Sequence, residues 1–177
     1  MGQGIWADAR TPDPQARGLE GQDLASSTLN SRAPRSEPEL SVIRHGPMAL
    51  RLRQQLPALQ QLLDDNSFWA AGRSRKQLTR MLGGSQAVVS AWRGQRLVGF
   101  GRASSDGVFR AVLWDVVVAQ DHQGQGLGRR LVEQLLEAPA LRGVERVYLM
   151  TTNSSGFYLQ LGFQPVGSQR LMLKTSG

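Results

Sequence analysis

The sequence predicts an α/β domain, an α+β three-layer sandwich around a mixed, mostly antiparallel sheet. Apolar residues recur at helical spacing in some segments and at every second position in others. This periodicity indicates elements in the order β-α-α-β-β-β-α-β-α-β. Of the 177 residues, 40% are hydrophobic, which is enough for one core of this class. We expect the domain to span residues 39–177.

Residues 1–38 are expected to form a disordered tail, because they are rich in Gly, Pro, Ser and Gln and lack apolar periodicity. They show neither the apolar region of a secretory signal nor the acid-poor composition of a transit peptide, which predicts a cytoplasmic protein. No apolar run approaches the length of a membrane-spanning helix, so none is expected.

The predicted domain begins with a short strand, Leu40–Ile43, which is followed by two helices. Leucines repeat at helical spacing over residues 50–63, and Pro57 predicts that a helix either starts or kinks inside that run. The second helix is predicted over Ser74–Leu82. Ser74 is its expected N-cap, and the two glycines that follow residue 82 are its expected stop.

Alternation at every second residue then predicts a meander of three strands at 87–92, 96–102 and 110–119. A helix follows, and its apolar face is formed by Leu127, Leu131, Val132, Leu135 and Leu136. The remaining elements are predicted to be a strand over 146–151, a short helix over 154–161 and a final hairpin or pair of strands over 163–173.

A glycine-rich segment, Gln123-Gly124-Gln125-Gly126-Leu127-Gly128, joins the meander to its helix. Glycines let backbone N–H groups approach an anion, and a helix start adds partial positive charge. Arg129 and Arg130 would be unfavourable in the first helical turn without an anion in front of them. The segment predicts a phosphate-binding loop, although it matches neither the dinucleotide fingerprint nor the P-loop. The alternative is a tight turn whose glycines only supply positive φ angles.

This loop, which follows the strand end Val116-Val117-Val118, resembles the Gln/Arg-x-x-Gly-x-Gly/Ala signature of the GNAT superfamily of acyl-CoA-dependent N-acetyltransferases. The resemblance covers roughly residues 40–175 and implies the GNAT fold, with coenzyme A bound at the loop. Thr151 stands where the family often has Asn. The cofactor-binding residues that the resemblance implies are Val116, Val117, Val118, Gln123, Gly124, Gln125, Gly126, Leu127, Gly128, Arg129, Thr151 and Tyr158.

A second segment, Gly156–Phe163, resembles the Phe-Tyr-x-x-x-Gly-Phe pattern of the same superfamily. The match implies that Tyr158 lies near the thioester sulfur and is the catalytic acid that protonates the departing thiolate. A phenol suits this role, because it remains a proton donor at neutral pH. The alternative is a core aromatic residue whose hydroxyl group bonds to a backbone carbonyl.

Asp115 is the candidate catalytic base, because it is the acid within an otherwise apolar strand and burial would raise its pKa. Two alternatives stay open: an ion pair with Arg102 or Arg110, and binding of the substrate ammonium. Relatives often carry Glu earlier on this strand, where Val112 stands, so a chain of waters is a further candidate for the base.

The composition restricts the chemistry. The sequence has no cysteine and only two histidines, His45 and His122, so it offers no disulfide, no cysteine nucleophile and no expected metal centre. His122 is expected to be exposed to solvent. The net charge of +7 suggests a polyanionic partner, unless it only reflects arginine usage. A nucleic-acid partner is not favoured, because no binding motif for one is recognisable.

The run Trp114-Asp115-Val116-Val117-Val118 is similar to the cyanobacterial and plastid acetyltransferases, the group of nuclear shuttle interactor and serotonin N-acetyltransferase. The resemblance implies transfer of an acetyl group from acetyl-CoA to a primary amine by direct attack in a ternary complex. The acceptor would be a protein lysine or N-terminus, or an arylalkylamine such as serotonin. The alternative is a non-catalytic acetyl-CoA-binding regulatory module. We expect no membrane partner, and a homodimer is left open.

Overall fold

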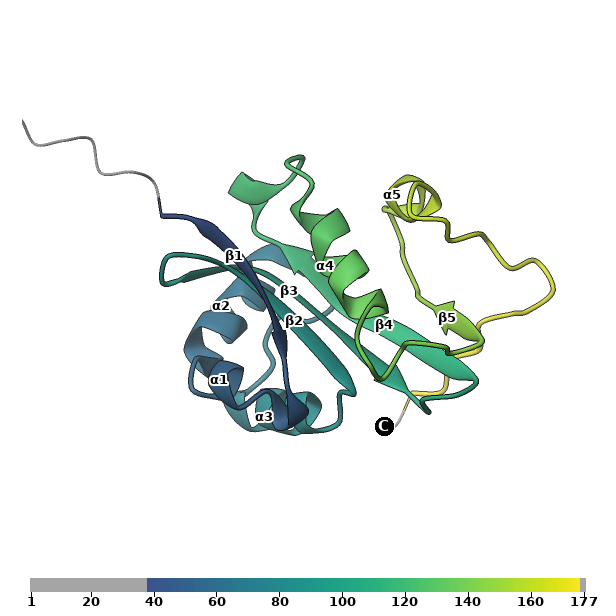
Figure 1. The fold of residues 1–177 in the computed structure, drawn as a ribbon, viewed down its shortest axis with the longest axis horizontal. Coiled ribbons are helices and arrows are strands. Elements are labelled where there is room, and N and C mark those ends of the chain that lie inside the picture. The colour runs from purple at the N-terminus through teal and green to yellow at the C-terminus, as the bar shows by residue number, and fades with distance from the viewer. Residues whose placement is uncertain (1–37, 176–177) are drawn as a thin grey trace, which may run out of the picture. The chain divides into compact units, whose positions relative to one another are not determined.

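The computed structural model describes residues 38–175, in which helices cover both faces of a five-stranded sheet (Figure 1). The tail expected over residues 1–38 lies almost wholly outside the described residues. Strands follow one another across the sheet in chain order, β1-β2-β3-β4-β5. Their bounds are Leu40–His45 for β1, Ala87–Arg93 for β2, Arg96–Ser105 for β3, Arg110–Val118 for β4 and Arg146–Tyr148 for β5.

The sheet is mixed, as the sequence predicts. Strands β1 to β4 pair antiparallel, with Leu40 opposite Arg93 and Ala87 opposite Ala103. Strand β5 pairs parallel to β4. A parallel neighbour requires a crossover connection, and helix α4 provides it.

Helices α1–α3 pack on one face of the sheet and α4 on the other (Figure 1). Among the described residues, no helix is long and apolar enough to span a bilayer. The helices are η1 (Pro47–Ala49), α1 (Leu50–Arg53), α2 (Leu56–Asn66), α3 (Arg75–Gly83), η2 (Gln120–His122), α4 (Leu127–Leu136) and α5 (Ser155–Leu159), of which η1 and η2 are 3-10 helices.

Two local signals determine where α2 and α3, on the first face of the sheet, begin. Pro57 lies in the first turn of α2, so the predicted run over 50–63 divides into α1 and α2, and the proline starts a helix rather than kinking one. Ser74 caps α3 as predicted and forms a capping box: Gln77 N donates to its hydroxyl at 3.4 Å, while its own N–H donates to the Gln77 side chain at 2.7 Å.

Helix α4 packs closely on the sheet because β3 has glycines beneath it. A Cβ atom at Gly99 would lie 3.0 Å from Leu131 Cδ1, and one at Gly101 would lie 3.0 Å from Leu135 Cδ1. The predicted apolar face of α4 is confirmed: Leu127, Leu131, Val132 and Leu135 are buried, and Leu136 is partly buried against the core. Close packing of this kind excludes water and fixes where α4 begins relative to the strands.

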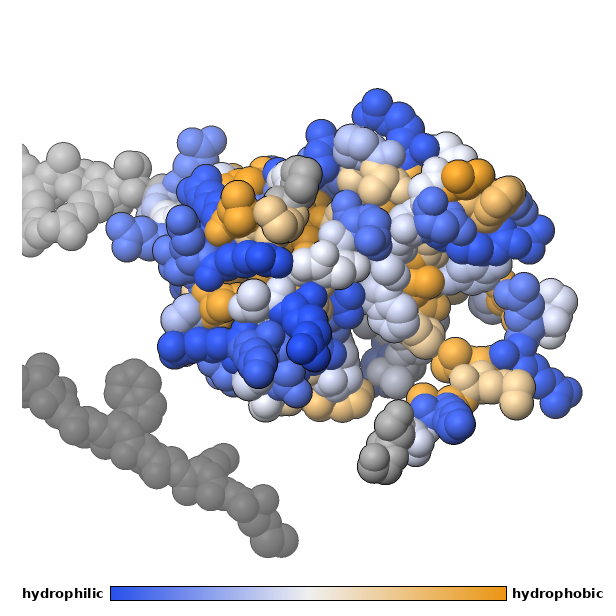
Figure 2. Space-filling model, turned by 90° about the horizontal axis from the view of Figure 1, so that it is seen from below, coloured by the Kyte–Doolittle hydropathy of each residue, from blue (hydrophilic) through white to orange (hydrophobic). Residues whose placement is uncertain are grey.

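The end of the described chain differs from the prediction. Strand β5 stops at Tyr148, and the hairpin expected over 163–173 does not form. Pro165 and Gly167 interrupt this segment, and the adjacent residues Leu171–Leu173 lack the alternation that would bury one face. Leu171–Leu173 are 78–90% exposed, and Figure 2 shows apolar side chains on the surface near this end of the molecule.

Candidate active site

A β-bulge interrupts the pairing of β3 with β4. Phe100 lies opposite Val117 and Arg102 opposite Trp114, so Asp115 and Val116 together oppose a single residue, Gly101. Asp115 has a φ angle of 49°, which is uncommon for a residue other than glycine. A bulge bends its strand and leaves a backbone group unpaired. The pairing of β4 is therefore irregular at Asp115 and Val116, and farther along the strand Val118 O accepts a hydrogen bond from Gln123 Nε2 at 3.0 Å.

Two arginines hold Asp115 at the bulge: Arg102 on β3 and Arg73 on the α2–α3 loop. Its Oδ2 accepts hydrogen bonds from Arg102 Nε at 2.7 Å and from Arg73 Nη1 at 3.0 Å, and its side chain is 4% exposed. Burial raises the pKa of Asp115, but the hydrogen bonds and charges of Arg73 and Arg102 outweigh burial, and the pKa lies below its ordinary value. Asp115 is therefore ionised and already engaged.

This geometry favours the ion-pair interpretation of Asp115 over the general base. Of the two arginines that the sequence offered, Arg102 makes the pair, whereas Arg110 lies 3.2 Å from Glu145 instead. The second partner, Arg73, comes from the α2–α3 loop. A carboxylate with a lowered pKa and two bound cations is a poor acceptor for the proton of an amine.

The glycine loop leaves the start of α4 uncapped. Gly124 and Gly126 have φ angles of 73° and 78°, and nothing lies within 4 Å of where a Cβ would stand on either. The N-cap residue Gly126 offers no side-chain hydrogen bond, and no acid lies in the first turn. The first N–H groups of a helix have no partner inside it, so this helix start presents donors and partial positive charge to open space. Helix α3, by contrast, is capped by its own side chains.

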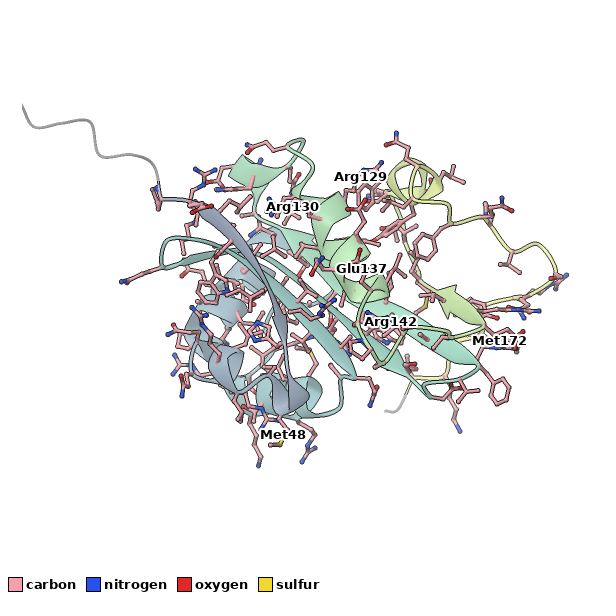
Figure 3. The ribbon with its side chains drawn as sticks, in the orientation of Figure 1. Met48, Arg129, Arg130, Glu137, Arg142 and Met172 are labelled. Carbon is pink, nitrogen blue, oxygen red and sulfur yellow. The ribbon has the colours of Figure 1, made fainter. Side chains whose placement is uncertain are left out.

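The loop opens onto a cleft of about 480 Å³. The predicted cofactor-binding residues that line the cleft are Val116, Val117, Val118, Gln123, Gly124, Gly126, Gly128, Arg129 and Tyr158. Figure 3 shows Arg129 on the side of α4 that faces α5, and Arg130 is absent from the cleft lining. The structure thus brings the glycine loop, the end of β4 and the predicted tyrosine to one space.

Three of the predicted cofactor-binding residues do not line the cleft. Leu127 is buried in the core, and the Gln125 side chain donates to the carbonyl oxygen of Asp121 at 3.1 Å. The Thr151 hydroxyl accepts a hydrogen bond from Ser154 N at 3.1 Å, just before α5. Thr151 lines a neighbouring cavity instead. Its hydroxyl group stabilises the turn before α5 through the hydrogen bond from Ser154 N.

Tyr158 stands between the cleft and that neighbouring cavity, which has a volume of about 910 Å³, and it lines both. Its ring packs edge-on against Phe157 and Phe163, with ring centroids 4.9 and 5.8 Å away. Burial raises its pKa, so the phenol is protonated at neutral pH. No described residue forms a hydrogen bond with its hydroxyl group, which differs from the interpretation as a core aromatic bonded to a carbonyl.

Five cleft residues were missed by the sequence analysis: Asn66, Trp69, Ser154, Phe157 and Gln160. Asn66 ties the end of α2 to the chain after β4, because its Oδ1 accepts from Gln120 N at 2.9 Å. Phe157 packs over the glycine loop, where a Cβ at Gly128 would lie 3.3 Å from its ring. The adjacent aromatics at 68 and 69 were the available sequence signal, since a solvent-exposed aromatic pair is uncommon without a function.

His122 is buried, with 7% of its surface exposed, whereas the sequence predicted an exposed ring. The 3-10 helix η2 turns its side chain inward, and its Nδ1 lies 3.0 Å from Asp121 Oδ1. Asp121 also accepts from Arg96 Nη2 at 3.1 Å, which ties the turn to the start of β3. His122 thus belongs to the support of the loop. Among the described residues, no cluster of three or more His, Cys, Asp or Glu could hold a metal ion.

Comparison with known proteins identifies the family. Residues 56–163 match the model of the acetyltransferase (GNAT) family. The chain belongs to the GNAT acetyltransferase family. Members of this family are acetyltransferases that use acetyl-CoA as a substrate.

Similar proteins include plant members of this GNAT family. The chain is 42% identical over 71 residues to GCN5-related N-acetyltransferase 2, chloroplastic, of Arabidopsis thaliana, which covers 40% of this chain and 28% of the relative. It is 48% identical over 69 residues to serotonin N-acetyltransferase 2, chloroplastic, of Oryza sativa subsp. japonica, which covers 38% and 34%. The chain therefore matches only about a third of the length of these relatives.

The fold matches solved GNAT structures. A crystal structure of a GNAT-family acetyltransferase from Xanthomonas campestris pv. campestris superposes with a TM-score of 0.65 at 26% identity. The match covers 79% of this chain and 95% of that one. The GNAT acyl-CoA N-acyltransferase fold expected from the sequence is confirmed.

Proposed function

We propose that this GNAT acetyltransferase transfers an acetyl group from acetyl-CoA to a primary amine by direct attack in a ternary complex. One observation carries the proposal: the uncapped start of α4, the bulged end of β4 and the Tyr158 ring all face the same cleft. The acceptor classes considered are a protein lysine or N-terminus and a small arylalkylamine.

The cleft supplies two kinds of main-chain contact for acetyl-CoA. The N–H groups of the loop from Gly124 to Arg129 suit the diphosphate, because a helix start attracts anions. Arg129 lines the cleft and adds a guanidinium group at that end, with Glu133 3.7 Å away on the same helix. The main chain of Val116–Val118, next to the bulge, would bind the pantetheine arm and hold the thioester at attack distance.

The chemical step follows from what lines the cleft. The amine nitrogen forms a bond to the carbonyl carbon of the thioester, the carbon–sulfur bond breaks, and the thiolate takes its proton from the Tyr158 hydroxyl group. Because the sequence has no cysteine, transfer through an acetylated cysteine is excluded. Among the described residues that line the cleft there is no Asp or Glu, and Asp115 is engaged by two arginines. Water would therefore carry away the proton of the amine.

Calorimetry and a thiol-release assay test this proposal. The purified chain should bind acetyl-CoA, and adding amines should release free coenzyme A thiol together with the acetylated amine. Binding without thiol release across lysine peptides, peptide N-termini and arylalkylamines would overturn the enzyme assignment in favour of an acetyl-CoA-binding regulatory module.

A further inference from the structure

Two exposed aromatic residues stand at the edge of the cleft, on the loop between α2 and α3. Trp69 is 50% exposed and Phe68 is 76% exposed, and their rings meet edge-on with centroids 5.1 Å apart. Trp69 lines the cleft, whereas Phe68 does not. Helices α2 and α5 lie on different sides of β4 (Figure 1), so Trp69 and Tyr158 reach the cleft from different walls.

The indole N–H group of Trp69 distinguishes it from the other described tryptophans. Trp92 Nε1 donates to Ser90 Oγ and Trp114 Nε1 donates to Ser104 Oγ, each at 2.8 Å. Within residues 38–175, only the Trp69 indole N–H has no hydrogen-bond partner. A half-exposed indole with a free donor, placed at a cleft, offers both a flat apolar surface and one polar contact to a ligand.

The loop that carries Trp69 is held at several points, so the ring is positioned before any acceptor binds. Ser67 is buried and donates to Leu63 O at 2.7 Å, and Ala70 is buried and donates to Ser67 O at 3.3 Å. Further along the loop, Arg73 donates to Asp115 in the bulge at 3.0 Å. The carboxylate at the bulge thus also fixes the loop that presents Trp69. A surface that is already ordered loses less entropy when a ligand binds.

The charges around the cleft restrict the acceptor further. Among the described residues, the cleft lining includes Arg129 and no carboxylate. The neighbouring cavity beyond Tyr158 is lined by Arg146 and Arg170 and also lacks a carboxylate. Glu133 lies 3.7 Å from Arg129 and Glu145 lies 3.3 Å from Arg146, but neither glutamate lines these spaces. Additional ammonium groups on an acceptor would therefore meet arginines in the lining and no carboxylate. The cleft is therefore suited to an acceptor with one amine and an uncharged body.

We propose that Trp69 determines acceptor specificity by stacking its indole on the flat, uncharged body of an aromatic monoamine. This inference rests on the proposed function and adds the residue that selects among the acceptor classes named there. Asp115 acts in it as a positioning residue through Arg73, while Trp69 touches the acceptor.

The test compares two acceptors of the same chain length, 2-phenylethylamine and 2-cyclohexylethylamine, with spermidine as the polycation. We expect the parent protein to prefer the phenyl compound over both. Trp69→Ala should raise the KM for 2-phenylethylamine about tenfold and remove the preference over the cyclohexyl compound. The KM for acetyl-CoA should stay within about twofold, because Trp69 is proposed to contact the acceptor and so the substitution removes binding energy for the acceptor alone.

Two further variants make the result decisive. Trp69→Phe keeps an aromatic face and should retain most of the preference for the phenyl compound. Phe109→Ala removes an equally exposed aromatic on the β3–β4 turn, away from the cleft, and should change neither KM. Circular dichroism of each variant verifies that it is folded. If Trp69→Phe loses as much as Trp69→Ala, stacking is wrong.

Failure of this inference is distinguishable from failure of the proposed function. An unchanged KM for 2-phenylethylamine in Trp69→Ala would overturn the inference, as would faster acetylation of spermidine than of 2-phenylethylamine by the parent protein. In either case thiol release would still support amine acetylation. Acetyl-CoA binding without thiol release from any of these amines or from a lysine peptide would contradict the proposed function itself.

Discussion

Arg102 and Asp115 are joined across the β3–β4 bulge by a 2.7 Å hydrogen bond from Nε to Oδ2. The same carboxylate oxygen accepts from Arg73 on the α2–α3 loop. One buried acid therefore links the bulge in β4 to the loop that carries Trp69. This structural role accounts for a buried carboxylate at the bulge without assigning Asp115 the role of a base.

Replacing Asp115 by Asn tests the structural role. We expect Asp115→Asn to lower the free energy of unfolding by about 3 kcal/mol, because it leaves two partly buried arginines without a counter-charge. The folded variant should keep measurable acetyl transfer. Urea unfolding together with thiol release measures both effects. Glu145→Gln breaks the exposed pair with Arg110 and should change stability far less.

The same carboxylate gives the stability a predicted pH dependence. The pKa of Asp115 is lower in the folded chain than its ordinary value. The contribution of this carboxylate to the free energy of unfolding is therefore fully present above about pH 4, and it is lost as the pH falls through the folded-state pKa. The parent protein should therefore lose more stability than Asp115→Asn when urea unfolding at pH 6 is compared with unfolding near pH 3. Equal losses in the two proteins would contradict the lowered pKa.

The hydroxyl of Tyr158 should matter for turnover and not for binding. Tyr158→Phe keeps the ring and its edge-on contacts with Phe157 and Phe163, so we expect kcat to fall about 100-fold while acetyl-CoA affinity is retained. Steady-state kinetics and calorimetry separate the two effects. Tyr148→Phe is the matched control, because Tyr148 lines the neighbouring cavity but not the cleft. Unchanged kcat in Tyr158→Phe would remove the tyrosine from the mechanism.

A side chain placed on the glycine loop should block acetyl-CoA. Gly126→Leu puts a side chain where a Cβ now meets open space and strains a residue with a φ angle of 78°. Gly107→Leu is matched in strain, since Gly107 has a φ angle of 79° and open space, but it lies on the β3–β4 turn. Both variants should lose similar stability, about 1 kcal/mol. Only Gly126→Leu should weaken acetyl-CoA binding, which calorimetry measures.

The pH dependence of catalysis follows from the absence of a carboxylate in the described cleft lining. We expect kcat/KM to rise with pH until the acceptor amine loses its own proton, and to shift when an amine of different pKa is used. Because burial raises the pKa of Tyr158, the decline at alkaline pH should lie above about pH 10. A rise centred near pH 6 for every amine would indicate a protein base instead.

Features that are local in the sequence could be predicted from it. The helix start at Ser74, the apolar face of α4 and the uncapped turn at Gly126 all depend on residues a few positions apart. The family pattern around Tyr158 is similarly short. These signals were sufficient to predict most of the helices and strands and much of the cleft lining, because spacing along the chain determines which residues share a helix face or a turn.

Features that depend on distant partners could not be predicted. Arg73 lies 42 residues before Asp115, and Asn66 lies 54 residues before Gln120, so neither contact has a sequence pattern. From the sequence, an ion pair and a role as general base were both open for Asp115. The second arginine, Arg73, is what decides between them, and its contact is visible only in the structure. The burial of His122 and the missing hairpin over 163–173 depend in the same way on how neighbouring segments pack.

We expect the main chain from Gly124 to Arg129 to bind the diphosphate of acetyl-CoA. Calorimetric titration of the folded chain with acetyl-CoA, and with acetylpantetheine, which lacks the diphosphate, tests it most directly. We expect binding of acetyl-CoA in the micromolar range and far weaker binding of acetylpantetheine. Equal affinity for the two compounds, or no heat of binding with millimolar acetyl-CoA, would contradict it.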